Sequence, residues 1–405
     1  MNLLIFSESF YPHGGGAELA TWLYSKGLAE KGFKVTVVTR QFPGESSAAL
    51  LDNGIEIYRL PADFMFNTRY YTLANVGLLT SSFIVNLIRK SNVIYVPCGW
   101  YSVIPIAKLH KKPVIVHLHN YSLICSTSLM YNFAEQKIKP STQKSLILHE
   151  MLQHNRGSAS IFGASMMNEF IGQHYYQLGK FADAFIFVSN AQRNLILSKI
   201  PEIKEKSCVI FNPIPPIPLI KTEGKGIGYF GGRSHVKGFQ VLINALNSLN
   251  RTQGVETYLP MTSPRQAKLK LSNGVTLNIS PKVNLASIMK KISIVVVPSL
   301  CPEPSPYTLI ESMAYGKLVI AARVGGMPEI LEGAGFGVKM VQPGNPNEIS
   351  DALDSFSALN LGEINELGLK NREFITRKFV DNTSFSSFIR ILDKLNSHTK
   401  SILAN

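Results

Sequence analysis

Short runs of β-branched and other apolar residues recur along the chain, and stretches with helical periodicity separate most of them. Such runs are typical of strands that are buried on both faces of a parallel sheet. The expected strands cover residues 3–6, 33–39, 55–60, 93–96, 114–119, 182–189, 292–297 and 318–322. Because parallel neighbours require crossover helices, the pattern predicts an α/β protein with doubly wound sheets.

The length of 405 residues indicates two or three domains, because one hydrophobic core rarely serves so long a chain. Four prolines between residues 213 and 218 form a stiff connector between two parts. We therefore expect one domain over 1–212 and a second over 213–375. A C-terminal segment over 376–405 carries apolar residues at helical spacing and is expected to be helical.

The composition is that of a globular protein, with 45% hydrophobic, 17% charged and 10% aromatic residues. The cysteines lie far apart without a Cys-x-x-Cys pair, so neither a zinc site nor a disulfide framework is expected, and a reducing compartment fits. They are Cys98, Cys125, Cys208 and Cys301. No apolar run approaches the length of a membrane span, and residues 1–6 read as a strand and not as a signal peptide. A cytoplasmic protein is expected.

The stretch over 297–316 reads as the end of a strand, a stiff turn and a helix. Three prolines end the strand, good helix formers follow, and Gly316 stands where a helix C-terminus favours glycine. The amides of Tyr307 and Thr308 would then point out of a helix N-terminus at the carboxyl end of a strand. Such a place suits an anion, and a diphosphate is the natural occupant.

Two carboxylates bracket this predicted anion site, Glu303 in the turn and Glu311 in the helix, with seven residues between them. The spacing resembles the Glu-x7-Glu signature of the retaining GT-B glycosyltransferases of family 4 (glycosyl transferases group 1). By position, the resemblance implies that Glu303 contacts the transferred sugar, that Glu311 holds the nucleotide ribose, and that Tyr307 and Thr308 hold the diphosphate. Without it, Glu303 would be read as a solvated loop acid and Glu311 as an ordinary helix-face carboxylate.

Residues 15–18, Gly-Gly-Ala-Glu, match a pattern that in this family lines the cleft between donor and acceptor. The resemblance therefore implies that Gly15 and Gly16 lie against the donor. The preceding strand and following helix make the loop compatible with phosphate. It is not a dinucleotide fingerprint, because bulky Leu19 stands where a third small residue belongs. A flexible turn that starts a helix is the alternative.

Residues 226–238 resemble the family's Gly-Arg…Lys-Gly element, whose Arg and Lys clamp the donor diphosphate. Lys237 matches, whereas Arg233 is offset by one position and the family's arginine position falls on Gly232. The alternative for Lys237 is a surface lysine at a helix start, where a cation is unfavourable unless an anion binds there. Residues 325–329 match the family's Gly-Gly-x-Pro-Glu, which could equally be a glycine turn before a short helix.

The strand that ends at His119 places His117 and His119 on one face, at the edge of the sheet where open α/β folds bind ligands. The residues from His119 to Cys125 resemble a His-Asp-Tyr-x-x-x-Cys run of a family branch, in which the histidine lies beside the reacting sugar. His119 is the expected catalytic residue, and His117 is the second candidate. Asn120 stands where many members have Asp, which leaves the charge state of the histidine open.

The resemblance implies two facing Rossmann-like domains with a cleft between them, the donor mainly on the second, and a last helix that crosses back to the first. It implies a hexosyltransferase-type enzyme without a cofactor, acting with a UDP- or GDP-sugar and a lipid-linked or oligosaccharide acceptor in cell-surface polysaccharide or lipopolysaccharide biosynthesis. The chain has no Asp-x-Asp, so a metal-independent reaction is expected. A GT-B-like sugar-nucleotide epimerase and a non-catalytic nucleotide-sugar-binding partner remain alternatives.

The formal net charge of +14 is spread over the chain. Residues 1–210 carry 20 Lys and Arg against 13 Asp and Glu, and residues 211–405 carry 21 against 14. Nucleotide-sugar diphosphates, anionic lipid-linked acceptors and the anionic inner face of the cytoplasmic membrane would all attract such a surface, so peripheral membrane contact is expected. No nucleic-acid-binding signature accompanies the charge, so nucleic acid is not an expected partner.

Overall fold

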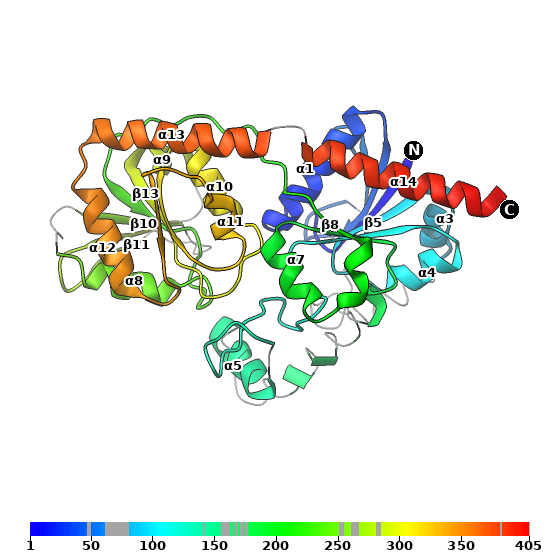
Figure 1. The fold of residues 1–405 in the computed structure, drawn as a ribbon, viewed down its shortest axis with the longest axis horizontal. Coiled ribbons are helices and arrows are strands. Elements are labelled where there is room, and N and C mark those ends of the chain that lie inside the picture. The colour runs from blue at the N-terminus through cyan, green and yellow to red at the C-terminus, as the bar shows by residue number, and fades with distance from the viewer. Residues whose placement is uncertain are drawn as a thin grey trace. The chain divides into compact units, whose positions relative to one another are not determined.

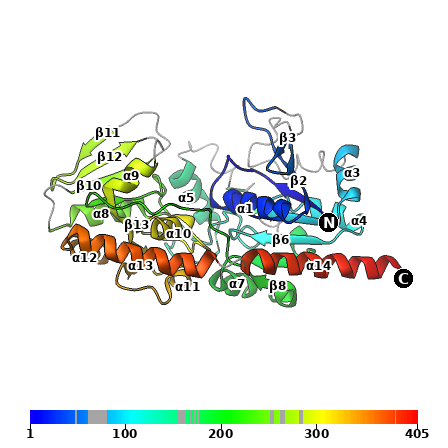
Figure 2. The same cartoon turned by 90° about the horizontal axis from the view of Figure 1, so that it is seen from above.

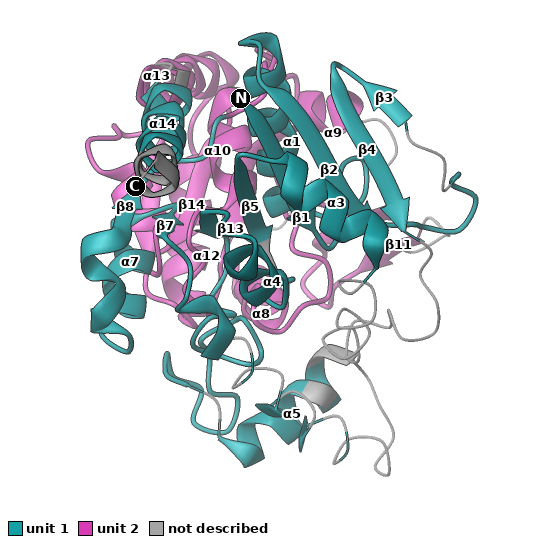
Figure 3. Ribbon diagram, turned by 90° about the vertical axis from the view of Figure 1, so that its right-hand side faces the viewer, with its two compact units in different colours: residues 1–213, 382–405 teal, residues 214–381 magenta. Residues whose placement is uncertain are grey.

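The computed structural model divides the chain into two compact units, which Figure 3 colours separately. Unit 1 consists of Met1–Pro213 and Asn382–Asn405, and unit 2 consists of Ile214–Asp381. The structure describes residues 1–46, 50–60, 81–140, 142–154, 163, 165–166, 169–170, 174, 177–250, 255–260, 267–280, 285–380 and 383–404. Unit 1 is therefore built from both ends of the chain.

The described strands of unit 1 form one eight-stranded sheet, parallel throughout except for the edge strand β3. Figure 1 labels β5 and β8 of this sheet, and Figure 3 shows β3 beside β4. In spatial order they are β3 (Leu50–Asp52), β4 (Ile55–Leu60), β2 (Lys34–Arg40), β1 (Asn2–Ser7), β5 (Val93–Cys98), β6 (Val114–Leu118), β7 (Ala184–Phe187) and β8 (Ser207–Val209). The strands expected from the apolar runs are confirmed, whereas β3 was not predicted because it is a short exposed edge. The direction of strand order reverses between β1 and β5.

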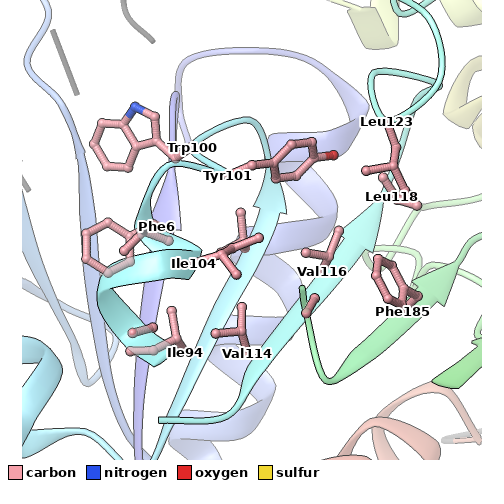
Figure 4. Close-up of a cluster of buried hydrophobic side chains, with 14 of the residues drawn as sticks. Phe6, Ile94, Trp100, Tyr101, Ile104, Val114, Val116, Leu118, Leu123 and Phe185 are labelled. Carbon is pink, nitrogen blue, oxygen red and sulfur yellow. The ribbon is translucent and has the colours of Figure 1, made fainter. Parts of the chain in front are cut away.

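Helices cover both faces of this sheet, as its apolar runs require. The helical segments of unit 1 are α1 (Gly16–Glu30), α3 (Ser82–Lys90), α4 (Val103–Leu109), α5 (Gln143–His154), α7 (Asn190–Leu197), the 3₁₀ helix η2 (Pro201–Lys206) and α14 (Thr383–Ala404). Alternate strand residues point to opposite layers. Leu3 and Ile5 pack with residues of α1 and α14, whereas Leu4 and Phe6 pack with residues of α3, α4 and α7. Figure 4 shows part of the second layer, in which Phe6, Ile94 and Ile104 meet.

The described strands of unit 2 form a seven-stranded sheet, in which only the edge strand β11 is antiparallel (Figure 2). In spatial order they are β11 (Ala267–Lys270), β12 (Thr276–Ser280), β10 (Glu256–Pro260), β9 (Gly226–Gly228), β13 (Ile292–Val297), β14 (Leu318–Ala322) and β15 (Val338–Val341). β13 and β14 are confirmed as predicted. The outer strands β10–β12 escaped prediction because polar residues interrupt their apolar pattern.

The helices of unit 2 also lie in two layers. They are α8 (Phe239–Asn247), α9 (Leu285–Lys291), α10 (Tyr307–Ala314), α11 (Met327–Leu331), α12 (Pro346–Ser357) and α13 (Leu361–Val380). Ile294 and Val296 of β13 pack with residues of α8 and α12, and α10 packs against β13, β14 and α13. Together with the unit 1 sheet, this gives two Rossmann-like α/β units, the predicted fold class.

The position expected to start the last segment, residue 376, lies inside α13. The helix continues there because Ile375 and Phe379, one turn apart, are both buried. The chain passes from unit 1 to unit 2 after Pro213, and unit 2 ends at Asp381. No helix among the described residues is both long and apolar enough to cross a bilayer. Cys125, Cys208 and Cys301 form no disulfide, and the Cys98 side chain lies outside the described residues.

Candidate functional site

The strand order of unit 2 reverses between β9 and β13, which lie side by side at the centre of the sheet. In open α/β sheets, ligands bind at the carboxyl ends of the strands at such a switch point, because the two connections leave in opposite directions there. The loop after β9 carries Lys237, and the turn after β13 carries Glu303. The fold thus brings two predicted site residues, 66 positions apart, to one place.

The ammonium of Lys237 donates a hydrogen bond to Oε2 of Glu303, and the two form an ion pair. The hydroxyl of Ser299 donates to Oε1 of the same carboxylate. The Glu303 side chain is 13% exposed and that of Lys237 is 39% exposed, so the acid is the more enclosed partner. Burial lowers the pKa of Lys237, but the neighbouring Glu303 carboxylate outweighs this and raises it, which keeps the lysine charged.

Two glycines let the backbone close around this pair. Gly238 has φ +77°, and a Cβ there would lie 2.0 Å from the carbonyl oxygen of Pro298. Gly325 has φ +61°, and a Cβ there would lie 2.3 Å from the carbonyl oxygen of Glu303. That carbonyl accepts the Gly326 N–H at 2.8 Å. The Lys-Gly and Gly-Gly-x-Pro-Glu sequences therefore hold the turn that carries Glu303.

The helix after this turn begins and ends as the sequence predicts. Pro306 is its N-cap, α10 starts at Tyr307, and Gly316 follows its C-terminus with φ +77°. The first amides of an α-helix have no acceptor within the helix, and Tyr307 and Thr308 are the first two residues of α10. Tyr315 caps the helix and is not part of it.

A cavity of about 320 Å³ opens beside α10. Thr308, Glu311 and Ser312 line one side of it, and Glu311 and Ser312 lie near Thr308 on the helix surface because they follow it by three and four positions. The remaining lining residues are mostly apolar, namely Phe230, Pro260, Leu285, Ile288 and Met289. A mainly apolar cavity with a few polar groups on one wall is typical of a small-molecule site.

Arg233, expected to clamp a diphosphate with Lys237, lies in an exposed turn of the same loop. Among the described residues the structure gives its side chain neither a hydrogen bond nor an ion pair, whereas Lys237 has Glu303. The structure thus brings Lys237 and Glu303 together and leaves Arg233 outside this contact.

In unit 1, the predicted glycine loop follows β1, at the switch point beside β5. Gly14 has φ +98°, and Gly15 and Gly16 are exposed at the start of α1. The Gly15 N–H donates to a carboxylate oxygen of Glu18 at 2.7 Å. One amide at this helix N-terminus is therefore already bonded to an acid in the first turn of α1.

His119 is the first residue after β6, at the carboxyl edge of the unit 1 sheet. Its ring lies 4.3 Å from that of His117, centroid to centroid, on the expected shared face. The hydroxyl of Tyr95 bonds to Nδ1 of His117 at 2.8 Å. Burial lowers the pKa of His119 to about 3 and that of His117 well below its usual range, so both rings are neutral near pH 7. Asn120 accepts the Ser122 N–H at 2.9 Å.

Several residues of these sites escaped the sequence analysis. Ser299 follows a predicted strand and could have been found from that position alone. The cavity residues Phe230 and Met289 come from separate connections, so only tertiary packing brings them to Glu311. The side-chain amide nitrogen of Asn212 lies 3.4 Å from Nδ1 of His119. The only sequence feature that marks this residue is its position directly before the proline connector.

Two family profiles match the chain. The profile described as Glycosyltransferase Family 4 matches residues 14–216, about half of the chain, and the one described as Glycosyl transferases group 1 matches residues 224–358. An uncharacterized 42.6 kDa protein in the cps region of Klebsiella pneumoniae is 24% identical over 337 residues, which are 82% of this chain and 87% of that protein. An uncharacterized glycosyltransferase of Methanocaldococcus jannaschii is 26% identical over 53% of this chain and 60% of its own length.

Solved structures share the fold over the whole length. The Anabaena protein HepE, in complex with UDP-glucose, matches with a TM-score of 0.63 and 17% identity, over 100% of this chain and 99% of that one. Sucrose-phosphate synthase from Thermosynechococcus elongatus matches with a TM-score of 0.63, 16% identity and the same coverage. On the two family profiles and this two-unit fold, the chain belongs to the GT-B glycosyltransferases that the profiles describe.

Proposed function

We propose that this glycosyltransferase moves a hexose from a UDP- or GDP-sugar to a lipid-linked or saccharide acceptor, with retention of the anomeric configuration. The observation that carries the proposal is the Lys237–Glu303 pair at the unit 2 switch point, in the same unit as the cavity that Glu311 lines. A cell-surface polysaccharide or lipopolysaccharide pathway is proposed because a relative is named for a cps region.

The donor would use the groups of unit 2 in the order in which they lie along α10 and its preceding turn. The nucleobase would occupy the apolar side of the cavity, and Glu311 would accept hydrogen bonds from the ribose hydroxyls. The amides of Tyr307 and Thr308 would bind the diphosphate. Glu303, before the helix, would then face the transferred sugar, where a carboxylate stabilises developing positive charge.

The diphosphate of a bound donor would offer Lys237 a second partner besides Glu303. A diphosphate offers more negative charge than one carboxylate and accepts charge-assisted hydrogen bonds from an ammonium. We expect Lys237 to turn from Glu303 to the diphosphate, while Ser299 continues to hold Glu303. The ion pair would thus keep the two groups ordered in the empty protein and release the acid for catalysis.

Positive charge for the leaving diphosphate would come from Lys237 and the first amides of α10, without a divalent ion. The absence of Asp-x-Asp from the sequence supports this part of the proposal. Transfer should therefore persist in excess EDTA. Complete loss that added Mg²⁺ or Mn²⁺ restores would overturn metal independence.

The acceptor would bind to unit 1, near the glycine loop of Gly15 and Gly16 and near His119. A neutral imidazole can donate or accept one hydrogen bond without adding charge. We propose that His119 contacts a hydroxyl of the transferred sugar and does not act as a general acid, since its pKa of about 3 keeps it unprotonated near neutral pH.

Contact with an anionic membrane would use the amino edge of the unit 1 sheet. Leu109 is 80% exposed and Phe181 is 56% exposed. Their segments are tied together by the ion pair of Lys108 with Asp183, at 2.6 Å. Lys111 and Lys180 flank these apolar side chains in sequence. The apolar side chains would insert into the bilayer, and the lysines would be attracted to its anionic headgroups.

The membrane proposal predicts salt-sensitive binding to vesicles that contain phosphatidylglycerol. Replacing Leu109 and Phe181 by Ser should reduce vesicle sedimentation, whereas Phe336→Ser, at a side chain that is 90% exposed in unit 2, should not. Equal binding of all three proteins would exclude this edge as the membrane contact.

The donor proposal is tested by calorimetric titration with UDP-glucose, UDP-galactose, GDP-mannose and the free diphosphates. Either the uridine or the guanosine nucleotides should bind. Lys237→Met should weaken their affinity by tenfold or more, since charge-assisted hydrogen bonds contribute roughly 1.5–3 kcal/mol. Lys221→Met is the control, because Lys221 is exposed on the connector. No binding of any nucleotide would refute the proposal. Interconversion of donor sugars without an acceptor would show an epimerase instead.

A further inference from the structure

Asn212 lies against the proposed catalytic histidine of unit 1. It is 2% exposed and follows the edge strand β8, just before Pro213. Its side-chain nitrogen Nδ2 is 3.4 Å from Nδ1 of His119. An amide nitrogen can only donate, so Nδ1 of His119 is the acceptor. A neutral imidazole that accepts at Nδ1 carries its proton on Nε2.

The backbone beside Asn212 is fixed by three elements. The carbonyl of Phe211 accepts hydrogen bonds from the hydroxyl of Tyr24 on α1, at 3.2 Å, and from that of Ser384 on α14, at 2.7 Å. The N–H of Ile210 donates to Phe187 of β7 at 2.9 Å. The backbone that carries Asn212 is therefore held in place from outside the histidine. Among the described residues, the side-chain oxygen Oδ1 of Asn212 has no hydrogen-bond partner.

The opposite ring nitrogen of His119, Nε2, lacks a hydrogen-bond partner among the described residues although it is enclosed by protein. Burying an N–H without an acceptor is unfavourable, and a hydroxyl oxygen of a bound sugar would satisfy it. The His119 side chain as a whole is only partly buried, although Nε2 itself is enclosed.

The titratable groups packed around the histidine pair do not supply a charge. They are His117 on β6, Tyr95 on β5, Tyr24 on α1 and Cys208 on β8. Burial raises the pKa of Tyr24 and of Cys208, so both stay neutral near pH 7. α14 contributes Phe388 to this layer, which does not titrate. The orientation of the His119 proton thus depends on Asn212 and not on a carboxylate.

We propose that Asn212 is a positioning residue that fixes the Nε2–H tautomer of His119, so that the ring donates a hydrogen bond to an oxygen of the sugar substrate. The inference rests on the proposed role of His119. Asn212 would donate a hydrogen bond to Nδ1 and so keep the proton on Nε2. An aspartate in its place would accept from Nδ1–H and leave Nε2 as an acceptor.

The first experiment reads the tautomer without any activity. Long-range ¹H–¹⁵N correlation spectra of histidine-labelled protein, with His119 assigned by its absence in His119→Gln, should show a protonated Nε2 and an unprotonated Nδ1. The pattern should persist between about pH 5 and about pH 8. A protonated Nδ1 in the unaltered protein would overturn the inference.

The second experiment reverses the hydrogen bond with Asn212→Asp. The carboxylate should draw the proton to Nδ1 and raise the pKa of His119. Turnover, followed as nucleoside diphosphate release, should then fall by tenfold or more at about pH 8 and recover toward about pH 5, where the imidazolium regains Nε2–H. The matched control is Asn194→Asp on the exposed face of α7, which should keep the pH profile of the unaltered protein.

The outcomes separate the two ideas. An unchanged Nε2–H tautomer in a folded Asn212→Asp protein would overturn the role of Asn212. A switched tautomer with unaltered turnover would overturn the proposed role of His119 instead. If Asn212→Asp does not fold, the spectrum of the unaltered protein still decides whether Nδ1 is the acceptor.

Discussion

At the scale of single residues, the two charged side chains of unit 2 depend on each other. Glu303 is nearly enclosed, and an enclosed carboxylate without partners would be unstable. Lys237 and Ser299 supply those partners, one to each carboxylate oxygen. Each group therefore has a structural task in the empty protein and, by our proposal, a different task when the donor is bound.

Because Glu303 and Lys237 would act differently once the donor is bound, substitutions at the two residues should affect donor affinity and kcat differently. Glu303→Gln should leave donor affinity unchanged or tighter, because Lys237 no longer has a competing carboxylate. The same change should lower kcat by roughly a hundredfold, about 2.7 kcal/mol, because the acid is lost where charge develops. Lys237→Met should instead weaken donor binding.

Calorimetry for donor binding and single-turnover kinetics for the chemical step would check the pair. A Glu303→Gln protein that loses donor affinity as strongly as Lys237→Met would contradict the assignment. The double variant should resemble Lys237→Met in affinity, since the two residues share one site.

Lys317 is a buried lysine that the sequence did not single out. It is fully buried, and its ammonium donates to the carbonyl of Ile220 at 3.0 Å and to the hydroxyl of Thr222 at 2.7 Å. Burial lowers its pKa from 10.5 to about 8. Between these two values the unfolded chain holds a proton that the folded protein has released, so the free energy of unfolding rises with pH.

Replacing Lys317 by Met should remove this pH dependence. As the pH rises from about 8 to about 10.5, the unfolding free energy of the unaltered protein should rise by up to about 3 kcal/mol relative to that of the Lys317→Met variant. Urea unfolding at several pH values measures it, with Lys221→Met as an exposed control. A constant difference would show that Lys317 keeps its ordinary pKa.

At the scale of elements, the site is made by turns that follow the central strands. The loop after β9 and the turn after β13 meet because their strands are neighbours, and the turn before α11 closes over the second of them. Positive φ values at Gly238 and Gly325 permit approaches that a side chain would block. The glycine sequences are thus packing requirements of the turn that carries Glu303, besides any contact with the donor.

Gly325→Ala should test this requirement. A Cβ there would lie 2.3 Å from the Glu303 carbonyl oxygen, so the turn must move. We expect a loss of roughly 2 kcal/mol or more in stability, together with weaker donor binding. Gly232→Ala is a matched control, because Gly232 also has positive φ, at +63°, but no atom lies within 4 Å of its added Cβ. Equal losses for both variants would mean that backbone strain alone is responsible.

At the scale of the whole molecule, the last helix belongs to the unit that begins the chain. α14 packs on α1 and β5, and Gly27 of α1 allows the ring of Phe385 to approach, since a Cβ there would lie 2.2 Å from it. Phe388 is fully buried, with its ring 5.1 Å from Tyr24 and 5.0 Å from Tyr95. The last helix therefore contributes part of the hydrophobic core of unit 1.

Phe388→Ala should destabilise unit 1 by roughly 3–5 kcal/mol, because it removes a buried ring from that core. Phe336→Ala, at a ring that is 90% exposed, should change stability by no more than about 0.5 kcal/mol. Thermal unfolding of both proteins compares them. An equally small effect of Phe388→Ala would show that α14 is not part of the unit 1 core.

Local chemistry along the sequence determined the central strands, the start of α10 at Tyr307 and its end before Gly316, because β-branched runs, prolines and glycine act within a few residues. The same reasoning placed Glu303 in a turn after a strand and Lys237 at the start of a helix. Only the tertiary structure decided that these two bond to each other, that Ser299 holds the acid and that Arg233 stays apart. It also fixed the neutral state of His119 and the contact with Asn212, since burial and contacts over 93 positions are properties of packing.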